Sequence, residues 1–377
     1  MISARVPATR RVWRGLRALY VAAVALVLAL LAGELALRLE RRRAGRDSEA
    51  YRARNVFIHA WELHAAAASL WLKPWWKYRP GARIDITVGG DRYLVEINSR
   101  GFRTPEFSAR KPPGTIRVLC VGASTTVAGR TNEQTYPAIL ERKLRERHRD
   151  LSLEVLNLGI SGTTSDYWQA RRDGLFSFEP DVVVEYRAVN DIFWRHLPRY
   201  AAAHPWRRAL RRSLLLERLF PLPADRLDAL LGETHENFLR TAQECARNDA
   251  RYVVATFAAP DPATAPRDFL RHLDVNLDFW NRDLPFHRYV EYEAIVARHN
   301  ELLERFAHRH GLALSPVHRR LRDPSLFIDI CHLTPEGIVG LADALLPEVD
   351  RAVIESAAWR LPSPSRSPGP WAASRPS

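Results

Sequence analysis

The chain has 377 residues, of which 46% are hydrophobic, so it is long enough for one large or two modest globular domains with an apolar core. Its formal net charge of +13 would suit nucleic acid or an anionic surface, but only four of the 56 basic residues are Lys and the arginines are spread along the whole chain. We therefore expect no nucleic-acid partner. Cys120, Cys245 and Cys331 form no CxxC pair and have no metal-ligand spacing to His, so neither a disulfide framework nor a metal site is indicated, and no cofactor is expected.

The first element in chain order is an apolar stretch long enough to cross a membrane. Residues 18–33 carry no charge, and residues 34–37 extend the stretch to 20 residues, which is what a helix needs to cross a hydrocarbon core of about 30 Å. We interpret 18–37 as an uncleaved transmembrane signal anchor behind a basic tail at 1–17. A cleavable signal peptide is the competing interpretation, but no clean small-x-small site follows the stretch. Arginines flank it equally on both sides, so the positive-inside rule leaves the orientation open.

A juxtamembrane segment and a β-hairpin are expected over residues 38–109. Residues 47–80 are rich in Trp and Ala, which fits either a helix lying at the membrane interface or a plain packing segment. Two β-like runs then surround Gly89, Gly90 and Asp91, and this turn signal predicts an antiparallel hairpin before the main domain.

The main domain is expected over residues 110–356, where short apolar runs alternate with helical patterns. We expect strands at 116–122, 153–159, 181–189, 251–259 and 312–317, and helices at 136–148, 165–176 and 291–311. The alternation predicts an α/β fold, a three-layer α/β/α domain whose parallel, flavodoxin-like sheet is covered on both faces. Helical insertions at 192–250 and 261–292 have lengths that suit lids or substrate walls. The Pro- and Ser-rich tail at 357–377 is typical of disorder.

Candidate functional residues follow three of the predicted strands, at the edge where open parallel sheets bind ligands. Ser124 comes after Gly122 and Ala123, which permit a tight turn, and its hydroxyl is either a nucleophile or a cap for the next helix. Gly159 follows the second strand and lets backbone N–H groups approach a ligand, although turn formation is the plainer role. Asn190 follows the third strand, either as an amide donor or in an Asx turn.

A serine nucleophile needs a base, so the other half of such a site is a histidine with an orienting carboxylate. Asp329 and His332 lie three residues apart, just before a helix that Thr334 can cap and Pro335 can begin. That spacing in a turn lets the carboxylate reach Nδ1 of the imidazole while Nε2 points toward the serine. Cys331 is a weaker nucleophile candidate, because neighbours in a chain rarely face each other for proton transfer.

The motifs GAST, NLGISG, AVND and DICH, in this order and spacing, resemble those of the SGNH/GDSL hydrolase superfamily over about residues 97–350. The flanking sequences INSRGFR and HLTPEG resemble members that carry an N-terminal membrane anchor. By position, the resemblance implies that Ser124 is the nucleophile, His332 the general base and Asp329 the residue that orients it. It also implies an oxyanion hole made of the backbone N–H groups of Ser124 and Gly159 and the side chain of Asn190.

Two positions depart from the pattern of that superfamily. Ala123 replaces the Asp of Gly-Asp-Ser, and Ala188 replaces the glycine before the Asn-Asp pair. Ala123 leaves the implied nucleophile in place and is expected to affect only local hydrogen bonding, and Ala188 is expected to crowd the backbone near the implied oxyanion hole. Neither changes the implied fold. The absence of Gly-x-Ser-x-Gly argues against the nucleophile elbow of the α/β-hydrolases.

The sequence therefore predicts a single-pass membrane protein with a serine esterase domain, which the resemblance places on the extracytoplasmic side. The expected substrate is an acyl ester on a polysaccharide or lipid, and an O-acetyl group on a cell-envelope glycan is the first choice. The nearest alternative is an O-acyltransferase with the same triad, in which a sugar hydroxyl replaces water. The others are a catalytically silent anchored binding module and an anionic-surface or nucleic-acid binder, whose affinity would fall steeply with salt.

Overall fold

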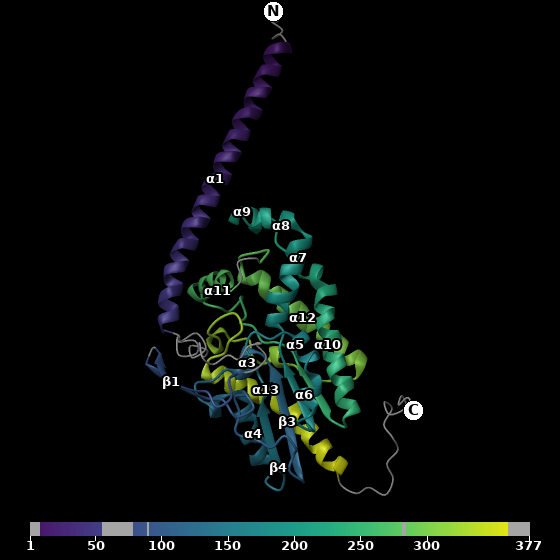
Figure 1. Ribbon diagram of the computed structural model, residues 1–377. Helices are drawn as coiled ribbons and strands as arrows, with labels where there is room; N and C mark the ends of the chain where they lie inside the picture. Colours follow the sequence, from purple (N-terminus) through teal and green to yellow (C-terminus); the bar gives the residue numbers. More distant parts are fainter. Residues whose placement is uncertain (1–7, 55–77, 89, 281–283, 361–377) are drawn as a thin grey trace, which may run out of the picture.

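The computed structural model describes residues 8–54, 78–88, 90–280 and 284–360 (Figure 1). Most of the Trp-rich segment predicted at 47–80 lies outside these residues, and so do parts of the tails predicted at 1–17 and 357–377. The last helix, α13 (Pro335–Arg360), continues past residue 356 and includes the first four residues of the predicted C-terminal tail.

Five parallel strands form the central sheet. They are β3 (Thr115–Gly122), β4 (Ser152–Asn157), β5 (Val182–Tyr186), β6 (Arg251–Ala255) and β7 (Ala313–Ser315). Their order across the sheet is β4-β3-β5-β6-β7, which is the 2-1-3-4-5 order of flavodoxin-like folds. Every residue of β3 and β5 is buried, because helices cover both faces of the sheet. The predicted α/β/α fold is confirmed.

Alternate side chains of β3 point to opposite faces of the sheet and join two different apolar clusters. Val118 and Cys120 pack with α4 (Tyr136–Arg147) and α13. Leu119 and Val121 belong to the second cluster, which also contains side chains of four helices. These helices are α5 (Ser165–Gln169), α6 (Arg172–Phe176), α10 (Asp228–Arg247) and α12 (Tyr289–His310). The single helix predicted over 165–176 is therefore two short helices, both covering the same face.

The predicted hairpin is present before the sheet. Strands β1 (Arg83–Val88) and β2 (Asp91–Glu96) are antiparallel, and Val88 pairs with Asp91 across a two-residue connection. Gly90 in this connection has a φ of +90°, which L-residues with a side chain rarely adopt. The backbone N–H of Leu94 donates to the carbonyl of Arg130 at 2.9 Å, so the hairpin is joined to the loop that follows the first strand of the sheet.

The two predicted insertions build a helical lobe above the sheet. The first, predicted at 192–250, starts within η3 (Asp191–His196) and contains α7 (Leu197–Ala203), α8 (Pro205–Leu210), α9 (Leu214–Leu219), η4 (Ala224–Leu227) and α10. The second, predicted at 261–292, contains α11 (Arg267–Trp280). In Figure 1, α7, α8 and α9 extend from the body on the side toward the N-terminal end of α1. The short helix α3 (Ser124–Val127), which marks the carboxyl end of β3, lies on that same side of the sheet.

Helix α1 extends far beyond the predicted span of 18–37 and runs from Ala8 to Arg54. It contains the one helix among the described residues that is long and apolar enough to cross a membrane, although a signal sequence would pass the same test. Its later turns contact the domain, since α1 packs against α9 and α11. The helix continues past the apolar stretch because its polar residues find partners there, including Glu34, which accepts a hydrogen bond from the N–H of Leu215 at 3.0 Å.

Three buried histidines lie between α10, α12 and η3. Nε2 of His235 is 3.2 Å from Nδ1 of His299, and Nε2 of His196 is 2.7 Å from Oγ1 of Thr234. Burial lowers the pKa of His196 and of His235 to about 4 and holds the pKa of His299 well below its usual value. These imidazoles are therefore neutral in the folded protein at neutral pH.

We predict that the free energy of unfolding decreases as the pH falls from 6.5 toward about 4, because the unfolded chain then binds protons on histidines that the folded chain keeps neutral. Each such histidine contributes up to about 1.4 kcal/mol per pH unit. The free energy of unfolding, measured with urea at several pH values in this range, should depend less steeply on pH for His235→Leu than for the unchanged chain. His308→Leu, at an exposed histidine of α12, is the control and should keep the original slope. An equal slope in His235→Leu would contradict the prediction.

Candidate active site

The turn after β3 brings Ser124 to the carboxyl edge of the sheet as the first residue of α3. Gly122 makes this turn possible: a Cβ there would overlap Oγ1 of Thr126 and lie 2.8 Å from the carbonyl oxygen of Tyr186. A side chain at position 122 would therefore push α3 away from β5. This close approach is the physical reason why the strand ends on a glycine immediately before Ala123 and Ser124.

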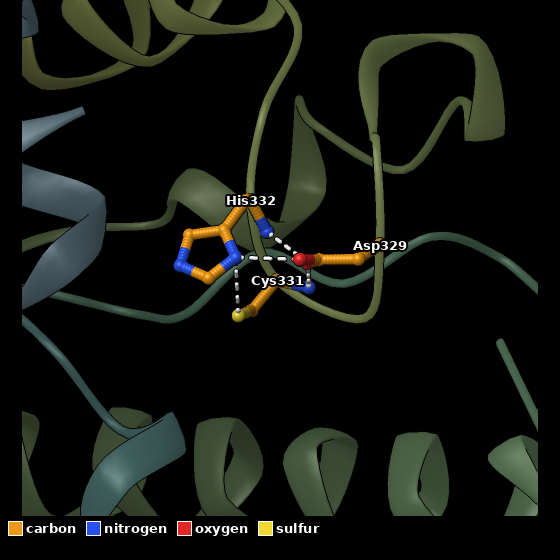
Figure 2. A group of neighbouring side chains, drawn as sticks. All are labelled: Asp329, Cys331 and His332. Atoms are coloured by element: carbon orange, nitrogen blue, oxygen red, sulfur yellow. Dashed lines mark hydrogen bonds and ion pairs between the residues drawn. The ribbon is translucent and has the colours of Figure 1, made fainter. Parts of the chain in front are cut away.

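The loop before α13 carries Asp329 and His332 in a closed turn. The N–H of Ile328 donates to the carbonyl of His332 at 2.9 Å, which closes the turn. One carboxylate oxygen of Asp329 accepts the backbone N–H groups of Cys331 at 2.9 Å and His332 at 2.7 Å. The other carboxylate oxygen lies 2.6 Å from Nδ1 of His332 (Figure 2). The Asp-x-x-His spacing thus lets the Asp329 carboxylate hold both the backbone N–H and the ring of His332.

The imidazole of His332 reaches Ser124 with its other ring nitrogen. Nε2 of His332 lies 2.9 Å from Oγ of Ser124, across 208 positions of sequence. Because an ionised carboxylate only accepts hydrogen bonds, the Nδ1 atom facing Asp329 carries the ring proton, which leaves Nε2 to accept from the serine hydroxyl. The structure therefore brings together the three residues that the sequence predicted as nucleophile, base and orienting carboxylate.

Asp329 is completely buried, yet its environment favours the charged form. Burial alone would raise the pKa of this carboxyl, but the charge and hydrogen bond of His332 and the two backbone N–H groups hold the pKa well below its usual range. Asp329 consequently stays ionised throughout the neutral range and can stabilise a positive imidazolium on His332.

Cys331 adds a thiol beside the imidazole, with Sγ 3.6 Å from Nδ1 of His332 (Figure 2). Burial and the neighbouring Asp329 carboxylate raise the pKa of this thiol well above its usual value, so it stays protonated and is a poor nucleophile. Potential ligand atoms of Asp329, Cys331 and His332 lie within 4.8 Å of one another. A protonated thiol and an imidazole nitrogen already hydrogen-bonded to the carboxylate suit a proton relay better than a metal centre.

Asn190 lies at the carboxyl end of β5, just before η3, and is nearly buried. Its Nδ2 donates to the carbonyl of Thr163 at 2.9 Å. A primary amide carries two N–H donors, so one N–H is used in holding the side chain and the other can serve an oxyanion. The hydroxyl of Thr163 donates to the carbonyl of Ile160 at 2.7 Å, and its Oγ1 lies 3.3 Å from the carbonyl oxygen of Gly122 at the end of β3.

Gly159 lies next to the serine turn, because a Cβ there would be 2.9 Å from Cβ of Thr126. Its backbone N–H donates to Oδ1 of Asn157 at 3.0 Å. A residue has a single backbone N–H, so the donor that the sequence assigned to the oxyanion hole is already hydrogen-bonded inside the chain. The structure thus brings Gly159 to the predicted place but directs its N–H to a side chain that the prediction did not include.

Sequence reasoning missed three buried polar residues that support this edge of the sheet. Asn157, at the end of β4, donates from Nδ2 to the carbonyl of Thr126 at 3.0 Å and so ties α3 to Gly159. Asp191 accepts the N–H of Ser165 at 3.0 Å and its hydroxyl at 2.6 Å. Arg103 donates to the carbonyls of Val127 at 2.6 Å and Gly129 at 2.9 Å, directly after α3. Two of these residues could have been found from the sequence. Asn157 is a polar residue at the end of an apolar strand pattern, and Arg103 belongs to the INSRGFR sequence.

Comparison with known proteins gives a family match and several similar structures. The model of the GDSL-like lipase/acylhydrolase family matches residues 120–338, and no curated protein matches the chain. One similar structure is LAE5, described as an alpha/beta hydrolase enzyme from the metagenome of Lake Arreo, Spain, with 19% identity and a TM-score of 0.41 over 63% of this chain and 96% of that one. Another is the acetyl xylan esterase AlAXEase, with 18% identity and a TM-score of 0.40 over 62% and 100% of the two chains. A catalytic mutant of Axe2, an acetylxylan esterase from Geobacillus stearothermophilus, has 17% identity and a TM-score of 0.41 over 62% and 94%. Similarity of this degree carries no argument about the activity or substrate of this chain.

We predict that Gly122→Ala lowers the free energy of unfolding by about 1 to 3 kcal/mol, because the added Cβ overlaps Thr126 and crowds the Tyr186 backbone. Urea unfolding followed by tryptophan fluorescence measures the loss. Gly174→Ala is the matched control, since nothing lies within 4 Å of a Cβ added to that helical glycine. Equal stability of the two variants would show that the close approach at Gly122 is not required.

Proposed function

This chain belongs to the GDSL-like lipase/acylhydrolase family, and from this premise we propose that it is a membrane-anchored serine esterase that acts through Ser124, His332 and Asp329. The observation that carries the proposal is the continuous hydrogen-bonded path from carboxylate to imidazole to hydroxyl, with 2.6 Å at the first step and 2.9 Å at the second. This is the arrangement that activates a serine for acyl transfer.

The proposed reaction has two halves joined by an acyl-enzyme. Oγ of Ser124 attacks the ester carbonyl while Nε2 of His332 takes the hydroxyl proton. The resulting imidazolium, stabilised by Asp329, returns that proton to the leaving alcohol as the carbonyl–oxygen bond breaks. Water then attacks the acyl-enzyme, again giving a proton to His332, and the acid leaves as Ser124 recovers its proton.

An oxyanion forms in both halves and needs hydrogen-bond donors already in place. We assign this role to the backbone N–H of Ser124, which as the first residue of α3 has no intrahelical acceptor, and to the second N–H of Asn190. Gly159 joins them only if its N–H is shared with, or released from, Oδ1 of Asn157. We therefore propose an oxyanion hole with two donors, Ser124 and Asn190, to which Gly159 adds a third when Asn157 releases its N–H.

The proposed substrate is an acyl ester, with an O-acetyl group on a cell-envelope glycan as the first choice. Its support is the family match together with an N-terminal helix apolar enough to hold the enzyme at a membrane. We place the catalytic domain on the extracytoplasmic side, as the resemblance to anchored SGNH/GDSL members implies. Transfer of the acyl group to a sugar hydroxyl in place of water uses the same residues, and an acceptor added to the assay distinguishes it.

The first prediction of this proposal is that a fluorophosphonate probe labels the full-length chain in detergent. Ser124→Ala should abolish labelling, and His332→Ala should slow it, because the hydroxyl then loses its base. Ser177→Ala, at an exposed serine hydrogen-bonded to the carbonyl of Gly174, is the control and should label as the unchanged chain does. A folded chain that fails to label would instead favour the catalytically silent binding module.

The second prediction concerns Asp329. Asp329→Asn should lower kcat for a small acetyl ester by roughly 10³- to 10⁴-fold with little change in KM, because the amide cannot hold the imidazole in the required tautomer. The pKa of Asp329 lies below its usual 3.8, so the carboxylate and its effect persist at high pH and are lost only as the pH falls below that value. The two kcat values are therefore compared at the pH at which each chain is most active.

Asp323→Asn is the control for this measurement. Asp323 is an exposed residue a short distance before the same loop, and it accepts only a local hydrogen bond from the N–H of Ser325. It should keep the original kcat. Retention of more than a tenth of kcat in Asp329→Asn would remove Asp329 from the proposed triad.

A further inference from the structure

Helix α9 has apolar side chains facing outward and buries one of its two charged residues, Glu217, while the other, Arg218, is exposed. Leu216, Leu219 and Phe220 are 38%, 57% and 55% exposed, and their i, i+3, i+4 spacing puts them on one side of the helix. Glu217, between the exposed Leu216 and Leu219 in the sequence, is 3% exposed and accepts the backbone N–H of His287. A helix facing water has the reverse pattern, so the surroundings of α9 are predicted to be apolar.

The backbone groups at both ends of α9 already have partners within the protein. Glu34 of α1 accepts the N–H groups of Leu214 at 3.3 Å and Leu215 at 3.0 Å, and Ser213 caps the N–H of Leu216 at 3.2 Å. At the other end, the buried guanidinium of Arg207 donates to the carbonyls of Phe220 at 2.6 Å and Pro221 at 3.1 Å. Satisfied helix ends are required where water is scarce, as at the boundary of a lipid bilayer.

Contacts with α1 put α9 at one end of the apolar stretch. A Cβ on Gly33 would lie 3.5 Å from a methyl group of Leu215, and Arg38 donates to the carbonyl of Arg212 at 2.7 Å. The uncharged stretch 18–33 ends immediately before Glu34, and at 1.5 Å per residue it covers about 24 Å of a hydrocarbon core of about 30 Å. Helix α9 therefore lies at the depth where α1 would leave the hydrocarbon. Figure 1 shows α8 and α9 at the same end of the domain as the free part of α1.

Helix α8 adds an aromatic and basic margin to this apolar face. Trp206 is 52% exposed, with the guanidinium of Arg207 4.6 Å from its ring centre. Arg208 and Arg212 are also exposed. Amphipathic Trp rings and cationic side chains beside an apolar face are typical of segments that lie among lipid headgroups. We call this set the α8–α9 surface: Trp206, Arg208, Arg212, Leu216, Leu219 and Phe220.

We propose that the α8–α9 surface is a second membrane contact, which lies in the headgroup region of the bilayer that α1 crosses. The inference rests on the part of the proposed function in which α1 spans a membrane, and it is independent of the esterase chemistry. The bilayer is the occupant because the surface is held against α1 at the end of its apolar stretch. Two points of contact fix the orientation of the catalytic domain on the membrane.

The test uses the full-length chain in nanodiscs of phosphatidylcholine and phosphatidylglycerol, with a spin label on a cysteine introduced by Leu219→Cys. Collisions with oxygen, which concentrates in lipid, are compared with collisions with a water-soluble nickel chelate. We expect an oxygen-to-nickel ratio severalfold higher at position 219 than for Ile354→Cys, a 50% exposed position on α13. Phe220→Cys should repeat the result. The native cysteines are all buried, and the unsubstituted chain supplies the labelling blank.

A label introduced by Leu28→Cys separates failure of this inference from failure of the anchor. If Leu28 reports lipid and Leu219 reports water, α1 crosses the membrane and the α8–α9 surface does not touch it, which overturns the proposal. If Leu28 itself reports water, α1 does not span and the proposal fails with it, whereas fluorophosphonate labelling still tests the esterase separately. A label at 219 that neither reagent reaches and that shows dipolar broadening would identify a second copy of the chain as the occupant, and would also overturn the proposal.

Discussion

The hydrogen bond between His332 and Ser124 is the contact on which the rest of the site depends. It joins two turns that are far apart in the sequence of the domain, one after its first strand, β3, and one before its last helix, α13. Each turn is held by a different element: α3 by the close approach of Gly122 to β5, and the His332 loop by the packing of α13 on α4 and the sheet. In the proposed mechanism, a displacement of about 1 Å in either turn would lower the rate heavily, because general base action requires hydrogen-bond distance. The parallel sheet, which holds both turns, thus fixes the distance between Nε2 of His332 and Oγ of Ser124.

Buried charge is tolerated at this edge because each group is compensated. Asp329 is fully buried and accepts three hydrogen bonds, two of them from the backbone of its own turn. Asp191, beside Asn190, is nearly as buried and is held by the N–H and hydroxyl of Ser165. Burial raises the pKa of Asp191, whereas the contacts of Asp329 overcome the same effect. Asp191 also has a cationic neighbour, with Nη1 of Arg195 3.5 Å away, whereas Nδ1 of His332 lies 2.6 Å from Asp329 and two backbone N–H groups donate to the other oxygen of that carboxylate.

Helix α1 is connected to the loop that carries Asp329 and His332 through the second insertion. Arg41 of α1 pairs with Asp278 of α11, and Asp278 also lies 2.7 Å from Nδ1 of His287. On its other side, α11 presents His272, whose Nε2 is 3.2 Å from the carbonyl of Ile328, one residue before Asp329. Helix α1 and the loop that carries Asp329 and His332 therefore share α11 as a common support, which makes α1 part of the packed structure of the domain.

The strand pattern in the sequence determined the sheet, because apolar runs between amphipathic helices can be buried only between two helical layers. The Gly89-Gly90 turn determined the hairpin in the same local way. Ser124, Asp329 and His332 were predictable because their motifs stand at strand and helix ends, where topology brings distant residues together. The length of α1 and the outward apolar face of α9 were not predictable, because each depends on partners that the fold supplies. Gly159 and Asn157 are only two positions apart, so their hydrogen bond is local and belongs with the turn chemistry of the sequence. Glu34 and Leu215 are 181 positions apart, and His287 and Glu217 are 70 apart. Sequence by itself determined what each segment can form, and the tertiary structure decided which polar groups meet, since those contacts exist only after the chain has packed.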